Sequence, residues 1–322
     1  LRSSRQEYTV PVLSQGRLLG MLHWYRQADG EGGCSSTPFL KNFLERVRRG
    51  GSPYPTKLGV SIVPGENREL RRLRGVPEEL DGVFVDAVQA GRPAAAAGLQ
   101  TGDLLLAANG HPIDREGQIK HPQFGKVHWS LAVTTEGRAA EPFPLRIWRG
   151  GKELEVAAVM EAYDPCDEVS PVFCPDRAPR FLMEGGFIFL ELSEPYLRGW
   201  GAEWETKAPL RLAAYNAFQL NLFNDRPRKI VILGHILPSP QTVGLPAKLI
   251  DAVVREANGR EIFSLDDLAA ALAAPQGAFQ RLVLDGEPYQ LVFDAEQARR
   301  LSRPLREAYD IPPDLRGDTA AP

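Results

Sequence analysis

The sequence predicts an α+β chain that is mainly β, made of short strands with flanking helices. Apolar and β-branched runs bounded by Gly or Pro recur along it, among them Leu58–Ile62 and Gly82–Val88, and such runs are typical of short strands. The pairs Asn109-Gly110 and Asn258-Gly259 are strong signals for tight hairpin turns. Because each pair is followed by a predicted helix and a predicted hairpin, about 150 residues apart, the chain contains a weak internal repeat.

The length and the charge limit the possible architectures and partners. A chain of 322 residues suits about two to three domains. A net charge of −3 argues against nucleic acid or an anionic membrane as a main partner. No run reaches the roughly 18 apolar residues of a membrane span. Because the sequence begins at Leu1 without Met or a signal sequence, we expect a processed product or a fragment whose compartment stays open.

Cysteine chemistry is only weakly indicated. The three cysteines, Cys34, Cys166 and Cys174, are an odd number that cannot all pair within one chain. Cys166 and Cys174 lie in a Pro- and Asp-rich loop, which fits either a bridge in an oxidising compartment or two free thiols. No His lies near either of them in the sequence, whereas a zinc site takes four ligands. We therefore expect no metal and no cofactor.

The stretch from residue 58 to residue 110 combines several predicted elements in a characteristic order. Between the two strands named above and Asn109-Gly110 come a helical turn, Pro93–Leu99, that ends at Gly98, and an apolar strand after Gly102. In this order and spacing the segments resemble a PDZ domain of the permuted kind found in Deg/HtrA serine proteases. The resemblance implies a small β-barrel with flanking helices over residues 57–160.

Strand addition is the recognition mode that this resemblance implies. A peptide with a free C-terminus pairs with the open edge strand of the PDZ sheet beside a helix, and backbone N–H groups at the strand entry bind its carboxylate, where a Gly is favoured. A groove helix is predicted over 125–135, with Val133 as one wall residue. The expected peptide-binding residues are Lys57, Leu58, Gly59, Val60, Ser61, Ile62, Val127, His128 and Leu131.

Other charged and titratable residues of this domain are interpreted as ordinary surface or loop residues. Arg68, Arg71, Arg72 and Arg74 are expected to form one solvated helix face. His121 lies in an insertion over 115–124 that a minimal PDZ domain lacks. For His121 and His128, sensing of ligand protonation is weighed against a loop histidine and a half-buried helix histidine, and the second interpretation is favoured.

Residues 1–50 are predicted to form a separate unit. Two strands, Tyr8–Leu13 and Arg17–Trp24, precede a helix from Thr37 to Val47, with Thr37 as N-cap and Pro38 in the first helical position. The unit resembles the last strands and C-terminal helix of a trypsin-like β-barrel, so we expect a C-terminal remnant of such a barrel.

The turn before Pro11 differs from that of an active Deg/HtrA protease. The resemblance places the nucleophile in a Gly-Asn-Ser-Gly-Gly-Pro turn, and here Tyr8 takes the serine position while Thr9 and Val10 replace the glycines. Glycines let the backbone direct its N–H groups at an oxyanion, and β-branched residues do not accept that conformation readily. We therefore expect no catalytic residue in this chain.

Residues 180–322 are expected to form a second, irregular PDZ-like domain with a C-terminal extension. Its candidate groove is a Gly-then-apolar strand entry comparable with that of the first domain. An amphipathic helix is predicted over 209–223, and Ser264 is predicted to cap a helix that ends at Leu272. The stretch Tyr309–Pro312 resembles the tail of plant-type Deg proteases. The candidate groove residues are Gly185, Gly186, Phe187 and Ile188.

Two functions follow from these observations. The first is a Deg/HtrA-type PDZ protein that recognises peptide C-termini or unfolded protein segments and is proteolytically silent as given. The alternative is the regulatory C-terminal half of an active Deg/HtrA-type serine endopeptidase in protein quality control. The resemblance also implies a homo-oligomer, a trimer or a multiple of it, and a periplasmic or other extracytoplasmic location if the source is bacterial. We expect no nucleic-acid partner and no membrane span.

Overall fold

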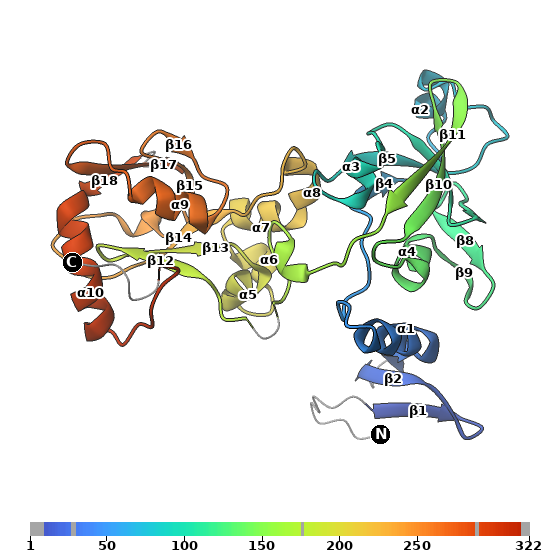
Figure 1. Cartoon of the computed structure of the whole chain (residues 1–322), viewed down its shortest axis with the longest axis horizontal. Coiled ribbons are helices and arrows are strands. Elements are labelled where there is room, and N and C mark those ends of the chain that lie inside the picture. The colour runs from blue at the N-terminus through green and yellow to red at the C-terminus, as the bar shows by residue number, and fades with distance from the viewer. Residues whose placement is uncertain (1–9, 27–29, 175–176, 287–289, 317–322) are drawn as a thin grey trace. The chain divides into compact units, whose positions relative to one another are not determined.

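The computed structural model describes residues 10–26, 30–174, 177–286 and 290–316. Its chain divides into two compact units, Leu1–Asp164 and Pro165–Pro322, drawn in Figure 1. Both contain antiparallel sheets with helices packed on them, which confirms the predicted α+β, mainly β class. The predicted boundary near residue 50 stays a prediction. Within the described ranges, none of the helices combines the length and apolar character that crossing a membrane requires.

The N-terminal segment is a three-stranded antiparallel sheet followed by a helix. The strands pair in the order β1-β2-β3. Thr37 is not the N-cap that the sequence predicted, because Ser36 takes that position and the Thr37 hydroxyl donates to the carbonyl of Leu18. Tyr8 lies outside the described residues, so its predicted place in a degenerate nucleophile turn is untested. The elements are β1 (Val10–Ser14), β2 (Arg17–Arg26), β3 (Glu31–Ser36) and α1 (Thr37–Arg48).

The main sheet of the first unit has the strand order β11-β10-β6-β5-β4, and short β7 pairs with β6. Strands β8 and β9 form a separate hairpin beside α4 (Figure 1). Asn109 and Gly110 both have positive φ, as the predicted hairpin turn requires. The elements are β4 (Val60–Val63), α2 (Arg68–Leu73), β5 (Val83–Val88), α3 (Pro93–Ala96), β6 (Leu104–Ala108), β7 (His111–Pro112), β8 (Gln118–His121), β9 (Gly125–His128), α4 (Ser130–Glu136), β10 (Pro142–Arg149) and β11 (Lys152–Val159).

The predicted groove helix begins too early in the sequence. Residues 125–128 are the strand β9, whose partner β8 lies in the insertion, and the helix α4 starts only at Ser130. The alternating pattern of a half-buried strand is present in β9, where Val127 is partly buried between exposed Lys126 and His128. Trp129 then turns its ring into the core and is 3% exposed.

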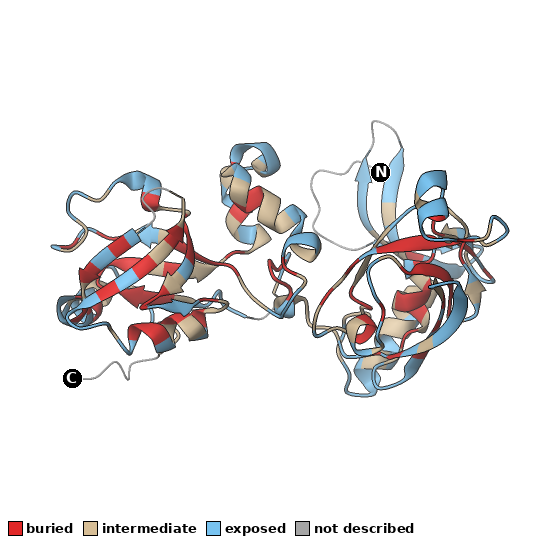
Figure 2. Cartoon of the chain, turned by 90° about the horizontal axis from the view of Figure 1, so that it is seen from above, coloured by how far each residue is buried: buried red, intermediate tan, exposed pale blue. Residues whose placement is uncertain are grey.

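The second unit repeats this sheet with one additional strand. Its order is β12-β13-β14-β15-β17-β18, and short β16 pairs with β15 as β7 pairs with β6. Figure 2 shows buried and exposed residues alternating along several of its strands, as expected for a sheet that packs on one face. The elements are β12 (Phe181–Glu184), β13 (Phe187–Glu191), β14 (Val231–Ile236), β15 (Val253–Ala257), β16 (Arg260–Glu261), α9 (Leu265–Leu272), β17 (Phe279–Asp285), β18 (Gln290–Asp294) and α10 (Ala295–Ala308).

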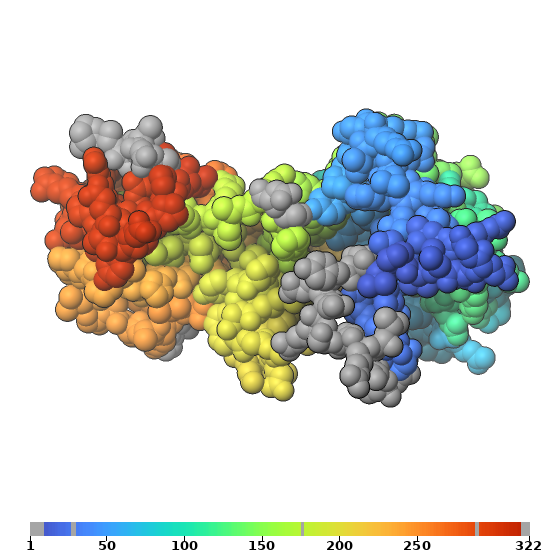
Figure 3. Space-filling view, turned by 90° about the horizontal axis from the view of Figure 1, so that it is seen from below, coloured from blue at the N-terminus to red at the C-terminus, as the bar shows by residue number. Residues whose placement is uncertain are grey.

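Two sequence signals in this unit are confirmed in detail. Asn258 and Gly259 have positive φ at the turn between β15 and β16. The Ser264 side chain caps α9 by accepting from the backbone N–H of Asp267. The C-terminal helix α10 covers one end of the sheet and forms a continuous red surface in Figure 3. Its side chain Ser302 accepts a hydrogen bond from the N–H of Gly185, in the turn between β12 and β13.

Short helices between β13 and β14 occupy the place of the predicted inserted helix. They bury Leu197, Leu212 and Phe223 in a small core of their own. Trp200 and Trp204 pack, partly buried, on that core. The helices are α5 (Glu194–Leu197), α6 (Trp204–Lys207), α7 (Leu210–Ala217) and α8 (Gln219–Leu222).

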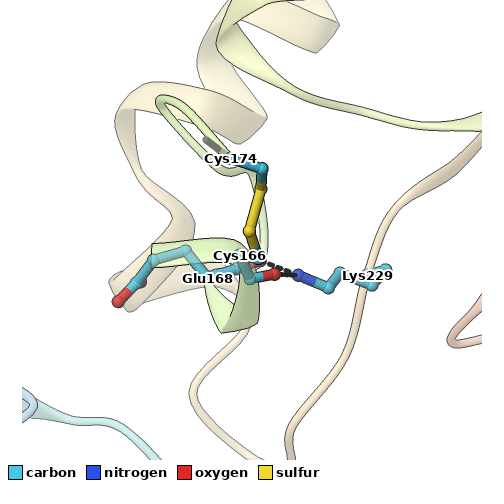
Figure 4. The surroundings of a disulfide bond; sticks show 4 residues. All are labelled: Cys166, Glu168, Cys174 and Lys229. Atoms are coloured by element: carbon cyan, nitrogen blue, oxygen red, sulfur yellow. Dashed lines mark hydrogen bonds between the residues drawn. A yellow bond between two sulfur atoms is a disulfide. The ribbon is translucent and has the colours of Figure 1, made fainter. Parts of the chain in front are cut away.

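A disulfide bond between Cys166 and Cys174 closes the loop that precedes these helices. Of the two alternatives that the sequence left open, the bridge is the one present in the structure. Figure 4 shows the Lys229 ammonium donating to the carbonyls of Cys166 and Glu168 inside the same loop. The loop also packs Val169 into the small core, so the bridge fixes a segment that contributes to packing.

Removing the disulfide should destabilise the second unit. Cys166→Ser with Cys174→Ser frees a loop of sequence separation 8, and the lost constraint is worth about 2 to 3 kcal/mol in the chain-entropy description. Thermal unfolding followed by calorimetry should show the second unit melting at lower temperature. The exposed thiol Cys34 offers the matched control, since Cys34→Ser should leave both transitions in place. An unchanged profile for the double variant would contradict a stabilising role of the bridge.

Arg71 does not belong to the solvated helix face that the sequence predicted. Its side chain is 1% exposed and donates to three carbonyls, those of Gly65 at 3.2 Å, Pro77 at 2.9 Å and Leu80 at 2.5 Å. Burial, with Arg115 nearby, lowers its pKa. The guanidinium therefore holds together the loops on either side of α2.

Replacing this arginine should be costly. Arg71→Met leaves three carbonyls without their donor, and we expect a loss of about 2 to 4 kcal/mol in the free energy of unfolding. Denaturant titration of the full chain measures it. Its neighbour Arg72, with 80% of its side chain exposed, gives the matched control, and Arg72→Met should cost less than about 0.5 kcal/mol. Equal losses in the two variants would show that Arg71 has no special structural role.

Candidate functional site

Strand β4 is one of the two terminal strands of the main sheet of the first unit, and β11 is the other. Strand β4 pairs with β5 on one side and lies at the end of the sheet. Val60 and Ile62 pack, partly buried, against a core cluster that also contains Ala132 and Val133 of α4. Among the described residues no strand pairs with the outer side of β4, so its outward N–H and C=O groups are a template for another chain.

The turn that enters β4 has the backbone conformation expected for a carboxylate-binding turn. Gly59 has φ +82°, and a Cβ built on it lies 2.4 Å from the Cβ of Arg92, so only glycine fits. The carbonyls of Leu58 and Gly59 accept from Ala94 and Gln89. The described hydrogen bonds include none donated by the N–H groups of Leu58 or Gly59.

Two cations lie beside this turn. The Lys57 ammonium and the Arg92 guanidinium are 5.3 and 5.6 Å from the centroid of the Tyr163 ring. Tyr163 also makes an edge contact with Tyr54. Sequence reasoning selected Lys57 from its place before Leu58, but it missed Arg92 and Tyr163 because they are distant in the chain. The positive charges of Lys57 and Arg92 favour an anion near the entry to β4.

Helix α4 supplies fewer wall residues than the sequence predicted. Leu131 is on α4 and partly buried, as proposed for a wall residue, whereas Val133 is 4% exposed and belongs to the core. Val127 and His128 are on β9 instead, and His128 is exposed with its Nδ1 2.8 Å from the hydroxyl of Ser130. Ser61 and Ile62 are on β4, partly buried. The peptide-site assignment therefore remains a proposal that rests on β4, its entry turn and Leu131.

The C-terminal end of α4 is held by a polar cluster that the sequence did not reveal. Glu136 accepts from the Asn109 amide at 2.6 Å and lies 3.0 Å from the Nε2 atoms of both His111 and His121. Burial alone would raise the pKa of Glu136, but the hydrogen bonds from Asn109 and the two histidines outweigh it and lower the pKa. His121 is 7% exposed and lies on β8, so the loop interpretation of this residue was wrong.

The predicted groove of the second unit is already filled. The sheet orders of the two units match when β13 is aligned with β4, and β12 then lies where an added strand would lie. Gly185 and Gly186 form the turn of the β12–β13 hairpin, and Phe187 is fully buried. Ile188 pairs with Met183 on one side and His235 on the other. The β13 edge is therefore not available to a peptide in this structure.

The outer side of β12 is also covered. The N–H of Leu315 donates to the carbonyl of Phe181 at 2.9 Å, and the Asp314 carboxylate accepts from the N–H of Met183 at 3.0 Å. The Arg316 guanidinium pairs with buried Glu184 at 2.6 Å. The C-terminal segment thus closes the sheet edge that β12 would otherwise present.

Comparisons with known proteins agree with this architecture. Two family models match, both described as PDZ domain, over residues 84–121 and residues 170–317. The first match lies in the unit with the open β4 edge. The second covers most of the unit in which β12 fills the corresponding position.

The curated relatives are Do-like and DegP-like proteins. The mitochondrial protein Do-like 3 of Arabidopsis thaliana is 19% identical over 290 residues, which is 88% of this chain and 48% of that protein. Protease Do-like 4, mitochondrial, from the same plant is 25% identical over 53% of this chain and 32% of its own length. A DegP-like protein of Marinomonas sp. (strain MWYL1) is 25% identical over 37% of this chain and 23% of its own length. The chain thus spans about half, or less, of these relatives.

Solved structures of the same type are similar over part of the chain. The HtrA-type protease AlgW with decapeptide is 21% identical, covers 47% of this chain and 43% of that chain, and has a TM-score of 0.35. The HtrA3 PDZ domain bound to a phage-derived ligand is 18% identical, covers 33% of this chain and 86% of that chain, and has a TM-score of 0.24. The family models thus show PDZ domains in the chain, and the curated relatives make it similar to Deg/HtrA-type proteins.

Proposed function

We propose that the first unit binds peptide C-termini or unfolded protein segments by strand addition to β4. The observation that carries the proposal is the terminal position of β4 in its sheet, next to a glycine turn with φ +82°. An added strand gains main-chain hydrogen bonds along β4, and its terminal carboxylate meets N–H groups at Leu58 and Gly59. The PDZ family matches support the same mode of binding.

Selection among peptides is proposed to come from charge and from one apolar wall. Lys57 and Arg92 favour the carboxylate end of the peptide, because charge-assisted hydrogen bonds are stronger than neutral ones. Leu131, partly buried on α4, offers an apolar contact to a peptide side chain. The second unit takes no peptide at β13 in this arrangement, since β12 lies there. The binding function is therefore assigned to one unit of the two.

The alternative is that the chain is the regulatory half of an active Deg/HtrA-type serine endopeptidase in protein quality control. The names of the relatives favour it, and so does the apolar surface of the N-terminal segment. Leu13, Leu19 and Trp24 are 63%, 53% and 50% exposed there, a surface that suits packing against further barrel strands or another subunit. A homo-oligomer, as the resemblance implies, belongs to the same proposal. The two functions are distinguished by testing whether the full-length gene product cleaves an unfolded protein substrate.

Binding at β4 is tested with the full chain and a phage-displayed library of C-terminal peptides. For a selected peptide, calorimetry should show binding that weakens at least about tenfold when the terminal carboxylate is amidated. Gly59→Val should abolish binding, because its side chain collides with Arg92. Leu131→Asp should weaken it by placing a charge on the apolar wall.

A second glycine offers a matched control for backbone strain. Gly151, in the β10–β11 turn, has φ +84° with no atom within 4 Å of a built Cβ, so Gly151→Val imposes the same backbone cost without touching β4. It should retain the affinity of the parent chain. Unchanged affinity in Gly59→Val, or an equal loss in Gly151→Val, would remove β4 as the binding strand.

A further inference from the structure

Three potential metal ligands converge at the C-terminal end of α4. His111 comes from β7, His121 from β8 and Glu136 from α4 itself. The His111 Nε2 is 3.0 and 3.2 Å from the two Glu136 oxygens, and the His121 Nε2 is 3.0 Å from Oε1. One ligand atom from each residue lies within 4.8 Å of the others. Residues 10 to 25 positions apart in the sequence are thus brought to a single point.

The surroundings of the cluster favour a defined geometry. The side chains of His121, His111 and Glu136 are 6%, 18% and 24% exposed, so the cluster is shielded but open on one side. The Asn109 amide holds Glu136 Oε2 at 2.6 Å, and the Phe124 ring packs on His121 at 4.8 Å between centroids. Outer contacts of this kind orient ligand side chains in known metal sites.

We propose that His111, His121 and Glu136 bind a divalent transition-metal ion of the zinc class. Two imidazoles and one carboxylate match the preferences of Zn²⁺, Co²⁺ and Ni²⁺, whereas Mg²⁺ and Ca²⁺ take oxygen ligands. Zinc bonds of about 2.0 to 2.2 Å in a tetrahedron place neighbouring ligand atoms about 3.3 Å apart, close to the nitrogen–oxygen distances given above. A water molecule completes the coordination on the open side.

Ion binding changes the hydrogen bonds of the cluster. The His121 Nδ1 accepts from the N–H of Gln123 at 3.1 Å, so its Nε2 carries the proton and donates to Glu136. An ion at Nε2 displaces that proton, and Nδ1 becomes the protonated nitrogen. The Gln123 N–H then turns away from the ring. Pro122 and Gln123 are exposed in the short turn between β8 and β9, which leaves them room to adjust.

The ion would connect α4 to β7 and β8. These contacts exist only in the folded chain, so the ion stabilises the folded state by mass action. This stabilisation does not require a peptide bound at β4. Metal binding and peptide binding can therefore succeed or fail separately.

The test uses the full chain after chelator treatment, titrated with Zn²⁺ by calorimetry and followed by thermal unfolding. We expect one Zn²⁺ per chain, a rise in the melting temperature of the first unit, and no such response to Mg²⁺ or Ca²⁺. Amide NMR should show a displaced Gln123 resonance. In Glu136→Gln, His111→Gln and His121→Gln the affinity should fall at least tenfold.

His128→Gln is the matched control, because His128 is exposed on β9 and outside the cluster. It should keep one ion per chain with unchanged affinity. Where a cluster variant unfolds, His111→Cys supplies a second measurement, since a thiolate ligand should restore binding and add a charge-transfer band with Co²⁺. Absence of binding to the parent chain, or binding unaffected by Glu136→Gln, would overturn the proposal.

Discussion

The hydrogen-bonding demand of sheet edges is the constraint on which this structure depends. Every strand carries N–H and C=O groups along both sides, and the groups of a terminal strand need a partner or water. The main sheet of the first unit has such a strand at each end, β11 and β4, and β4 is the one that begins at the glycine turn of Gly59. The second unit extends the equivalent position with β12 and then covers β12 with the segment around Leu315. The strand position of β4 and β13 is thus open on its outer side in the first unit and closed in the second.

Closing the second edge has consequences for packing as well. In the second unit, Leu182 of β12 is fully buried within the main core cluster, together with Phe187 and Phe293. Glu184 is buried next to Arg316, and burial raises its pKa although the arginine lowers it in part. A strand so firmly integrated is a permanent part of the domain rather than an exchangeable ligand. The proposed assignment of peptide binding to the first unit alone rests on this difference at a single strand position.

The sequence predicted elements best where local chemistry determines the backbone. Asn109-Gly110, Asn258-Gly259 and the Ser264 cap are confirmed because positive φ and helix capping depend on neighbouring residues alone. The start of α4 was misplaced, since β9 is a strand only by virtue of its pairing with β8. Likewise the buried position of Arg71 depends on carbonyls from the segment 77–80, which no local pattern reveals.

The candidate site was predictable only in part, for the same reason. Lys57 to Ile62 form a continuous segment, and their Gly-then-apolar pattern predicted an edge strand. In the structure, β4 does lie at one end of its sheet. The comparable pattern at Gly185 to Ile188 led to the wrong expectation, because the sequence pattern of a strand does not show how many neighbouring strands it has. The cluster of His111, His121 and Glu136 was missed since its members lie on three elements and share no motif.

The position of α4 shows how far the site depends on contacts from outside it. A helix of 7 residues is not stable by itself, so tertiary contacts must hold it in place. The Thr56 hydroxyl donates to the carbonyl of Val133 at 3.0 Å, and the Asn42 amide of α1 donates to that of Thr135 at 2.7 Å. Glu136 is held from the opposite side by Asn109 and the two histidines. The N-terminal segment and the insertion therefore both position the helix that carries Leu131, which physically links each of them to the proposed peptide site.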